Sequence, residues 1–400
     1  MSLPRILYVG TFPPHPGGSG VVNGYLMKCL HDSGYPLSVV TPSSTETAGR
    51  AELVRRVYPR IALVEVPVAR ASIIPWGTRL DDPERLAQVT RMQAACAEEA
   101  ERHRPGVVFA GRENYLDGVL PWAMSQSLPV VCRAPSSALL MDGVHGTTAR
   151  RFAFELMAKA DRIVAPAHHV AAGLANNGLS RIVTIQNPVD MARFRPASVD
   201  RDLAARHCLR PEHVVVAHAS NLKPVKRTDD IVAAAAPAVN RDPRLIFLIF
   251  GDGPDRAKLE EAVLDSGLTD HFRFTGWVDH TALGDHLRLA DMALITSATE
   301  GLAAAYLEAM ATSLPLLASD IAGAREVIED GKTGFLFPVG DAAAIADLIV
   351  KLAVDPALRH RIGSNARAYV EQNHRLEAAG DLLREVVADV VRQGRAVGAP

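Results

Sequence analysis

Short runs of apolar, often β-branched residues alternate with longer helical patterns along almost the whole chain. Such runs predict strands that are buried on both faces, because a half-exposed strand would alternate apolar with polar residues. Strands of this kind, separated by helices, form parallel sheets covered on both sides. Strands are expected at 5–10, 37–41, 61–66, 106–110, 128–132, 162–165 and 181–186, and again at 213–219, 244–250, 271–275, 291–296, 314–318 and 334–337.

The pattern predicts two doubly wound α/β domains, and 400 residues is a suitable length for two. The seam is expected at Asn187-Pro188-Val189-Asp190, and a charged, irregular stretch at 191–212 follows it. Ligands of doubly wound sheets bind beyond the carboxyl ends of the strands, so two such domains facing a central cleft would share one site. The predicted parts are an N-terminal domain at 1–188, a C-terminal domain at 189–370, and a C-terminal helix at 371–400 that packs back toward the N-terminal domain.

Composition and charge argue against several classes of protein. Lys and Arg number 43 against 45 Asp and Glu, for a net charge of −2, whereas proteins that grip nucleic acid usually carry a basic excess. No apolar run reaches the roughly 20 residues of a membrane helix, and the N-terminus turns polar too soon for a signal peptide. The spacing of the four cysteines fits neither zinc binding nor a disulfide framework. We expect a cytoplasmic protein with no nucleic-acid partner and no membrane association.

A glycine-rich segment, Gly17-Gly18-Ser19-Gly20, follows the first predicted strand and opens a helix expected at 20–33. Glycines let the backbone approach a ligand closely, and a helix N-terminus offers free N–H groups to an anion. The segment is not a Walker loop and does not fit G-x-G-x-x-G. A plain turn with Ser19 as the helix cap is the alternative.

Charged residues gather at two places in the second half. Lys223, Lys226 and Arg227 follow its first strand and suit a diphosphate, although a solvated loop would look the same. Glu300 and Glu308 lie eight positions apart around the start of an Ala-rich helical run. A buried carboxylate needs a partner, and sugar hydroxyls are suitable ones, whereas a surface pair is the alternative. Two strand-end turns suited to a nucleotide base are Phe250-Gly251-Asp252-Gly253-Pro254 and Phe274-Thr275-Gly276-Trp277-Val278.

Taken together and in this order, these segments resemble the retaining glycosyltransferases of family 4, which have the GT-B fold, over nearly the full chain. The two glutamates followed by Ala-Met-Ala are the most specific part. The glycine-rich start and the segment 220–227 look most like the branch of the family that acts in bacillithiol synthesis, and more distantly like the mycothiol branch. The other matching segments are Asn187-Pro188-Val189-Asp190, Arg193-Phe194-Arg195-Pro196, 250–254 and Gly323-Ala324-Arg325-Glu326-Val327-Ile328.

The resemblance implies roles for individual residues. Lys226 would bind the donor diphosphate, Glu300 would contact the transferred sugar, and Glu308 would hold the ribose hydroxyls. Lys226 and Glu300 are the expected catalytic residues, and neither a metal nor another cofactor is expected. The expected donor-binding residues are Gly17, Gly18, Asn221, Lys223, Lys226, Gly251, Trp277, Val278, Leu302, Ala303, Ala304 and Glu308.

The chain departs from the family pattern at three places. Leu302 and Ala303 stand where the family usually has Phe-Gly, which would reshape the sugar pocket. The family's arginine five residues before Lys226 is here Asn221. The bacillithiol branch also has Asn there, with a basic residue two positions on that corresponds to Lys223. The family histidine after the fifth strand is replaced by Pro135. The residues weighed as substitutes are Arg133, Asn114, Arg112, Glu113 and Arg151 in the acceptor site, and His145, His168 or His169 as the missing histidine.

The expected function is transfer of a sugar from a UDP- or GDP-sugar donor to a small acceptor that is anionic or bears a thiol. The anomeric configuration of the sugar is expected to be retained. A sugar or lipid-linked hydroxyl remains an alternative acceptor. The basic run Arg55, Arg56 and Arg60 is the only hint of a lipid surface. A sugar-nucleotide-binding protein without catalysis is the alternative from another class. Base, sugar, acceptor and oligomeric state, including a homodimer, stay open.

Overall fold

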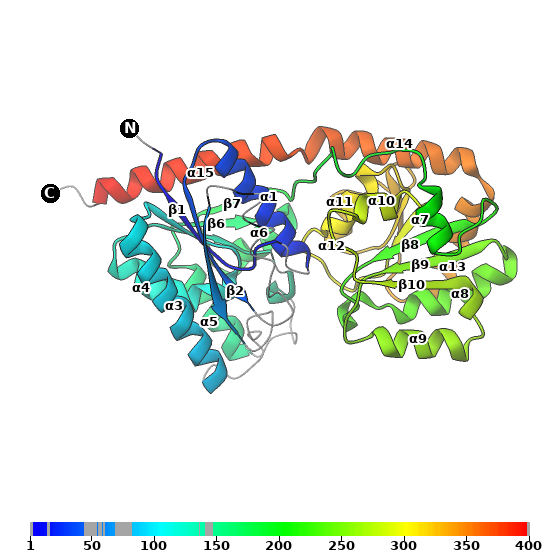
Figure 1. The fold of residues 1–400 in the computed structure, drawn as a ribbon, viewed down its shortest axis with the longest axis horizontal. Coiled ribbons are helices and arrows are strands. Elements are labelled where there is room, and N and C mark those ends of the chain that lie inside the picture. Colours follow the sequence, from blue (N-terminus) through cyan, green and yellow to red (C-terminus); the bar gives the residue numbers. More distant parts are fainter. Residues whose placement is uncertain are drawn as a thin grey trace. The chain divides into compact units, whose positions relative to one another are not determined.

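The computed structural model describes residues 3–13, 17–43, 54, 58, 61–68, 82–135, 137–140 and 147–397. The chain divides into two compact units (Figure 1). The first unit is Met1–Asn187 with Leu376–Pro400, and the second is Pro188–Arg375. Each unit is built around one fully parallel sheet with helices packed against it, which is the doubly wound arrangement that the sequence predicts.

The first unit contains a seven-stranded sheet in the order β3-β2-β1-β4-β5-β6-β7. All seven strands predicted in this half are present. Its central strands are buried on both faces, which explains why their sequences are almost continuously apolar. The strands are β1 (Ile6–Val9), β2 (Leu37–Ser43), β3 (Ala62–Pro67), β4 (Val107–Ala110), β5 (Val130–Arg133), β6 (Arg162–Ala165) and β7 (Ile182–Thr184).

The helices of the first unit include one from the far end of the chain. This helix, α15, packs on α1, and the Cys29 thiol donates to the Leu376 carbonyl at 3.3 Å. Gly380 allows the close approach, because a Cβ there would lie 2.6 Å from Cβ of Cys29. Arg384 donates to the Ser33 hydroxyl at 2.8 Å. The helices are α1 (Gly18–Asp32), α3 (Pro83–His103), α4 (Leu116–Ser125), α5 (Thr147–Met157), α6 (His168–Asn176) and α15 (Leu376–Val397), with short 3₁₀ turns η1 (Glu113–Tyr115) and η2 (Ser137–Leu140).

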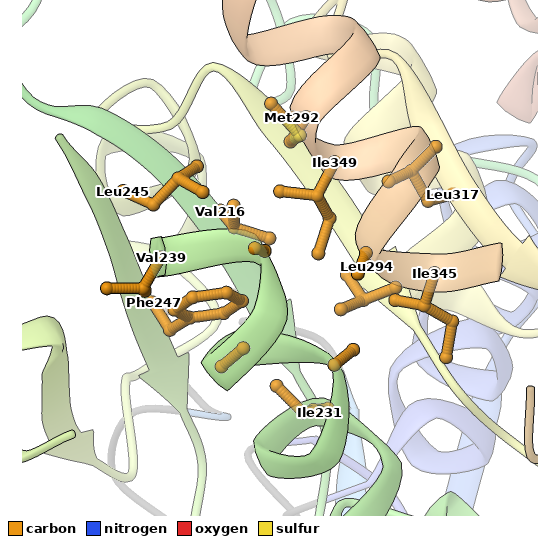
Figure 2. Packing of buried hydrophobic residues seen from close by; sticks show 14 of the residues in the cluster. Val216, Ile231, Val239, Leu245, Phe247, Met292, Leu294, Leu317, Ile345 and Ile349 are labelled. Atoms are coloured by element: carbon orange, nitrogen blue, oxygen red, sulfur yellow. The ribbon is translucent and has the colours of Figure 1, made fainter. Parts of the chain in front are cut away.

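The second unit contains a six-stranded sheet in the order β10-β9-β8-β11-β12-β13. Its six strands also lie where the sequence predicts them. Figure 2 shows its core, in which Val216, Phe247 and Leu294 of the strands meet Ile231 of α8 and Ile349 of α13. The strands are β8 (Val214–Ala219), β9 (Leu245–Phe250), β10 (Phe272–Gly276), β11 (Met292–Ile295), β12 (Leu316–Ser319) and β13 (Gly334–Phe337).

One expectation for the second unit is wrong. The stretch 191–212 is not irregular throughout, because a short helix, α7 (Arg201–Arg206), lies within it. Asp200 caps it by accepting from the backbone N–H groups of residues 202 and 203, and Leu203 anchors it in the core. The other helices are α8 (Asp229–Arg241), α9 (Arg256–Asp265), α10 (Leu283–Leu287), α11 (Ala304–Ala311), α12 (Ala322–Arg325), α13 (Ala342–Val354) and α14 (Pro356–Asn373), with η3 (Pro224–Lys226) and η4 (Thr269–His271).

The strand order places a topological switch point in each sheet. The order reverses between β1 and β4 in the first unit, and between β8 and β11 in the second. At such a point the two neighbouring connections leave toward opposite faces of the sheet, and ligands bind beyond the carboxyl ends of the two strands. The loops after these strands are therefore the expected ligand-binding loops.

Candidate active site

Lys226 and Glu300 meet at the switch point of the second unit. Nζ of Lys226 donates to Oε1 of Glu300 at 2.5 Å, and the Ser297 hydroxyl donates to the same oxygen at 2.7 Å. The loops are joined through their backbones as well, because Ala298 N–H donates to the Val225 carbonyl at 2.8 Å. The Lys226 and Glu300 side chains are 18% and 15% exposed. A half-buried ion pair at this edge is available to a ligand that carries both anionic and hydroxyl groups.

A buried histidine near the end of β8 anchors the loop that follows this strand. Nδ1 of His218 donates to the Leu294 carbonyl at 2.8 Å, and Nε2 accepts from the Ser220 hydroxyl at 2.8 Å. The Ser220 oxygen in turn accepts from Leu222 N–H at 3.2 Å. Complete burial lowers the pKa of His218 from 6.5 to about 4, so the ring is neutral at physiological pH. The chain of hydrogen bonds fixes the conformation of the loop that leads to Lys226.

The loop after β9 packs directly on the same segment. Gly251 has φ +123°, and a Cβ there would lie 1.8 Å from the Ser220 carbonyl oxygen. Gly253 approaches the carbonyl of Asn221 in the same way, at 2.0 Å for an added Cβ. The two glycines are therefore required for the contact between loops. Oδ1 of Asn221 is buried and has no hydrogen-bond partner among the described residues, whereas Lys223 is exposed.

The predicted sugar-pocket residues surround the start of α11. Leu302 and Ala303 are buried, and Ala304 is half-buried. No side chain in the described part of the chain caps the helix, so its first N–H groups remain available to an anion. Gly323 at the start of α12 packs on this loop, because a Cβ there would lie 2.6 Å from the Glu300 carbonyl oxygen. The substitution of Ala for the family glycine at position 303 is accommodated in an extended backbone conformation.

Glu308 lies one turn further along α11 and is 5% exposed. Its Oε1 is 2.8 Å from Nε2 of His280, and Nδ1 of His280 is 3.0 Å from Nη1 of Arg193. Trp277 and Val278 precede this histidine after β10, and Trp277 is 44% exposed. An exposed tryptophan is suited to stacking on a nucleotide base, and a buried carboxylate is suited to accepting from hydroxyl groups.

In the first unit, Gly17 and Gly18 form the start of α1, after β1. Gly17 is the N-cap, with φ +134°, and no atom of the described residues lies within 4 Å of an added Cβ. Ser19 is therefore inside the first turn and does not cap the helix, contrary to the alternative weighed from the sequence. Among the described residues, which leave out 14–16, no side chain caps the first N–H groups of α1. They are placed at the switch point between β1 and β4.

Arg133 lies at the end of β5 and is fully buried. Nη1 donates to Oδ1 of Asn23 at 3.2 Å, and Nη2 donates to Oδ1 of Asn187. Burial lowers the pKa of Arg133 to about 10, so it still carries its charge at neutral pH. Contact with a solvent-accessible acceptor would require the surrounding side chains to move. Its role in acceptor binding stays a prediction.

Three consecutive polar residues follow β4 at the same switch point. Glu113 is 3% exposed, and its Oε1 lies 3.8 Å from Nη2 of Arg112. Three buried atoms here have no hydrogen-bond partner among the described residues, namely Nε of Arg112, Oε2 of Glu113 and Oδ1 of Asn114. Unpaired buried polar atoms are costly, so a cluster of them indicates a place where a ligand or water completes the hydrogen bonding.

The other residues weighed for the acceptor site are placed less favourably. Arg151 is exposed on α5, with Nε 3.7 Å from Oε1 of Glu155. His168 is exposed and His169 is half-buried at the start of α6. His145 lies outside the described residues, as do Arg55, Arg56 and Arg60.

Sequence reasoning missed three residues of the site: Ser297, His218 and His280. The first two follow or end strands that were predicted correctly, so their place at the carboxyl edge was available in principle. His280 carried no signal beyond its position after β10, because a lone histidine is usually a surface residue. Its contact with Glu308 spans 28 positions and appears only in the folded chain.

No helix in the described part of the chain combines the length and the apolar character needed to cross a membrane. Within the same residues, no three His, Cys, Asp or Glu side chains gather into a group that could hold a metal ion.

Two family models match the chain, one in each half. The model of Glycosyltransferase Family 4 matches residues 16–193, and that of Glycosyl transferases group 1 matches residues 201–369. N-acetyl-alpha-D-glucosaminyl L-malate synthase of Bacillus anthracis is 27% identical over 392 residues, 96% of both chains. D-inositol 3-phosphate glycosyltransferase 2 of Catenulispora acidiphila is 26% identical, over 91% of this chain and 90% of its own.

The fold is shared with solved structures. HepE of Anabaena, crystallised with UDP and glucose, superposes with a TM-score of 0.81 over 96% of this chain and 100% of its own, at 20% identity. With both halves matched by models and the two parallel sheets in place, the chain belongs to glycosyltransferase family 4 and has the GT-B fold. It is an enzyme that transfers a sugar from a nucleotide-sugar donor. The resemblance seen in the sequence is thereby confirmed.

Proposed function

We propose that the enzyme transfers a sugar, with retention of anomeric configuration, from a UDP- or GDP-sugar to a small acceptor that is anionic or bears a thiol. The observation that carries the proposal is the Lys226–Glu300 pair at the switch point of the second unit. The pair combines a cation for a diphosphate with a carboxylate for sugar hydroxyls, beside the uncapped start of α11.

The proposed catalysis is electrostatic. When the bond from the sugar to the diphosphate breaks, negative charge grows on the leaving phosphate. Lys226, Lys223 and the first N–H groups of α11 would stabilise that charge, at a few kcal/mol for each well-placed donor. Glu300 would hold the transferred sugar through its hydroxyls, and Glu308 would hold the ribose. This division assigns the second unit to the donor and leaves the first unit for the acceptor.

The acceptor proposal rests on the polar cluster in the first unit. Arg112 is the accessible cation of the cluster, with 36% of its side chain exposed, and Asn114 offers a buried amide oxygen without a partner. Arg133 adds positive charge close enough to interact electrostatically with Arg112 and Glu113. A guanidinium binds a carboxylate through two parallel hydrogen bonds, so an anionic acceptor suits this group. The similarity to an N-acetyl-alpha-D-glucosaminyl L-malate synthase supports the same choice. We infer a setting in thiol biosynthesis from the resemblance of the sequence to the bacillithiol branch of the family.

The first experiment identifies the donor. Purified enzyme is screened by thermal shift against UDP, GDP and other nucleoside diphosphates, and then against sugar nucleotides of the best base. The best donor is next incubated in parallel with malate, small thiols and neutral polyols, and the product anomer is assigned by NMR coupling constants. We expect transfer to malate or a thiol, with the donor configuration retained.

Each outcome decides one part of the proposal. An inverted product would remove the retaining mechanism, and transfer only to neutral polyols would remove the anionic or thiol acceptor. If the donor binds but is neither transferred nor slowly hydrolysed, the result would favour a binding protein that has lost catalysis. Replacing Arg112 and Arg133 singly with alanine should raise the KM for the acceptor, and an unchanged KM in both would reject their assignment.

A further inference from the structure

We propose that His280 is a positioning residue, which donates a hydrogen bond to the Glu308 carboxylate and so fixes its orientation as an acceptor. Arg193 sets the tautomer of the His280 ring that makes this donation possible. The inference rests on the proposed function only for what Glu308 holds. The hydrogen-bonded chain from Arg193 through His280 to Glu308 lies wholly within the second unit. It joins the first residues after the seam to the loop after β10 and to α11.

The direction of each hydrogen bond follows from the chemistry of the groups. A guanidinium can only donate, so Nδ1 of His280, 3.0 Å from Nη1 of Arg193, must accept. In a neutral ring the proton is then on Nε2, which lies 2.8 Å from Oε1 of Glu308 and donates to it. A protonated ring would place two donors against each other at Nδ1.

Arg193 is itself held firmly. Oδ1 of Asp190 accepts from the backbone N–H groups of residues 192 and 193, and Phe194 N–H donates to the Asp190 carbonyl at 2.9 Å. Gly284 lets α10 approach, because a Cβ there would lie 2.6 Å from the Arg193 carbonyl oxygen. Phe194 is fully buried, and its ring centroid lies 5.3 Å from that of His280. The histidine therefore has a fixed partner on each nitrogen and a ring packed on one face.

The consequence for Glu308 concerns its second oxygen. Oε1 is engaged by His280, and no hydrogen bond to Oε2 is found among the described residues. The hydrogen bond from His280 fixes the orientation of the carboxylate, so Oε2 stays in one position as an acceptor for a ligand. The geometry selects a ligand with a hydroxyl donor at this point, and in the proposed function that donor is the ribose of the nucleotide.

The simplest competing explanation is packing, in which His280 only fills space beside Phe194. We compare His280→Leu, which keeps most of the volume, with His280→Gln, whose amide can donate to Glu308 and accept from Arg193. His271→Leu is the matched control, because His271 is another half-buried histidine near β10, with Nδ1 bonded to the Leu245 carbonyl. Thermal unfolding of all variants checks that the fold is kept.

The first readout needs no ligand. NMR of ¹⁵N-histidine-labelled enzyme near neutral pH reports the tautomer of each ring. We expect His280 as the neutral Nε2–H tautomer, and a mixture of tautomers in Arg193→Met. A protonated His280, or the Nδ1–H tautomer, would overturn the proposal whether or not the enzyme binds nucleotides.

The second readout is the affinity for UDP and for 2′-deoxy-UDP, or for the guanosine pair if the enzyme prefers it. We expect His280→Leu to weaken the ribonucleotide at least about fivefold, to leave the deoxynucleotide nearly unchanged, and to add nothing to Glu308→Gln. His280→Gln should recover most of the loss. Equal weakening of both nucleotides would mean packing alone. If the wild-type enzyme binds neither UDP nor GDP, the proposed donor is wrong. The tautomer measurement would still decide the role of His280 in that case.

Discussion

Single residues of the site hold one another in place through charges and hydrogen bonds. Glu300 accepts from both Lys226 and Ser297. Glu308 is held by His280, which no pattern in the sequence singled out. Because these groups are partly or fully buried, water cannot replace a partner that is removed. Substitutions here should therefore have larger effects than the same substitutions on the surface.

Replacing Lys226 with alanine should lower kcat/KM for transfer at least about tenfold, because a charge-assisted hydrogen bond to the diphosphate is worth roughly 1.5–3 kcal/mol. The variant is measured with the best sugar nucleotide under saturating acceptor. Lys258→Ala is the control, since Lys258 forms an ion pair with Asp229 while 66% of its side chain stays exposed. Equal activity of the Lys226 variant and the control would contradict the assigned role.

His218 should make the stability of the protein depend on pH. Burial lowers its pKa from 6.5 to about 4, so between these values the unfolded chain binds more protons than the folded one. The contribution of His218 to the free energy of unfolding is therefore fully present above about pH 6.5. It is lost as the pH drops toward 4, and the loss is on the order of 3 kcal/mol. Urea unfolding across this range should show a flatter pH profile in His218→Gln. His360→Gln, at an exposed position on α14, is the control and should keep the wild-type slope.

Elements determine where these residues meet. In the second unit, loops after β8, β9, β10, β11 and β12 all leave the carboxyl edge of one parallel sheet. Their mutual distances are fixed by backbone contacts, such as the approach of Gly251 to the Ser220 carbonyl. The site is thus built from rigid strand ends, which place the Lys226 and Glu300 side chains more exactly than free loops would.

Replacing Gly251 with alanine should destabilise the second unit by about 2–4 kcal/mol, because an added Cβ would overlap a backbone carbonyl and φ is positive. Gly267→Ala is the matched control. Gly267 also has positive φ, +66°, but nothing lies within 4 Å of an added Cβ, so only the backbone cost of about 1 kcal/mol remains. Urea unfolding measures both. Similar losses in the two variants would show that the contact between loops is not tight.

Transfer should persist when divalent ions are removed. Lys223, Lys226 and the uncapped N-terminus of α11 place positive charge at one edge of the sheet, which is what a diphosphate leaving group needs. The measurement is the initial rate in EDTA, compared with the rate in added magnesium or manganese. Complete loss in EDTA that a metal ion restores would show that these groups are not sufficient.

At the scale of the whole molecule, the chain forms two compact units that repeat one architecture. The C-terminal helix α15 belongs to the first unit, although the residues before it belong to the second. The candidate donor residues are concentrated in the second unit, and the polar cluster with unpaired atoms lies in the first. A ligand should therefore affect the two units unequally.

A nucleoside diphosphate at about 100 times its Kd should stabilise the part that binds it by about 2.7 kcal/mol. Because Lys226, Glu300 and Glu308 all lie in Pro188–Arg375, we expect the main gain in hydrogen-exchange protection there, in the loops after β8 and β11 and in α11. Smaller changes are expected at Gly17 and Gly18. Protection concentrated in Met1–Asn187 would reverse the assignment of donor and acceptor units.

Much of this could be predicted because the relevant signals are local. Thirteen strands lie where apolar runs predicted them, since a strand buried on both faces leaves a continuous pattern in the sequence. The short helix α7 was missed because its six residues bury only Leu203 and carry little periodicity. The candidate residues Lys226, Glu300 and Glu308 were found through spacing and family resemblance.

The sequence by itself determined the fold class, the family and the type of donor, because hydrophobic periodicity and short motifs are properties of neighbouring residues. The tertiary structure decided which groups touch. It buried Arg133 between Asn23 and Asn187, and it joined Arg193 to Glu308 through His280. Such contacts connect residues tens of positions apart, and they exist only once strand order and helix packing have brought those positions to one edge of a sheet.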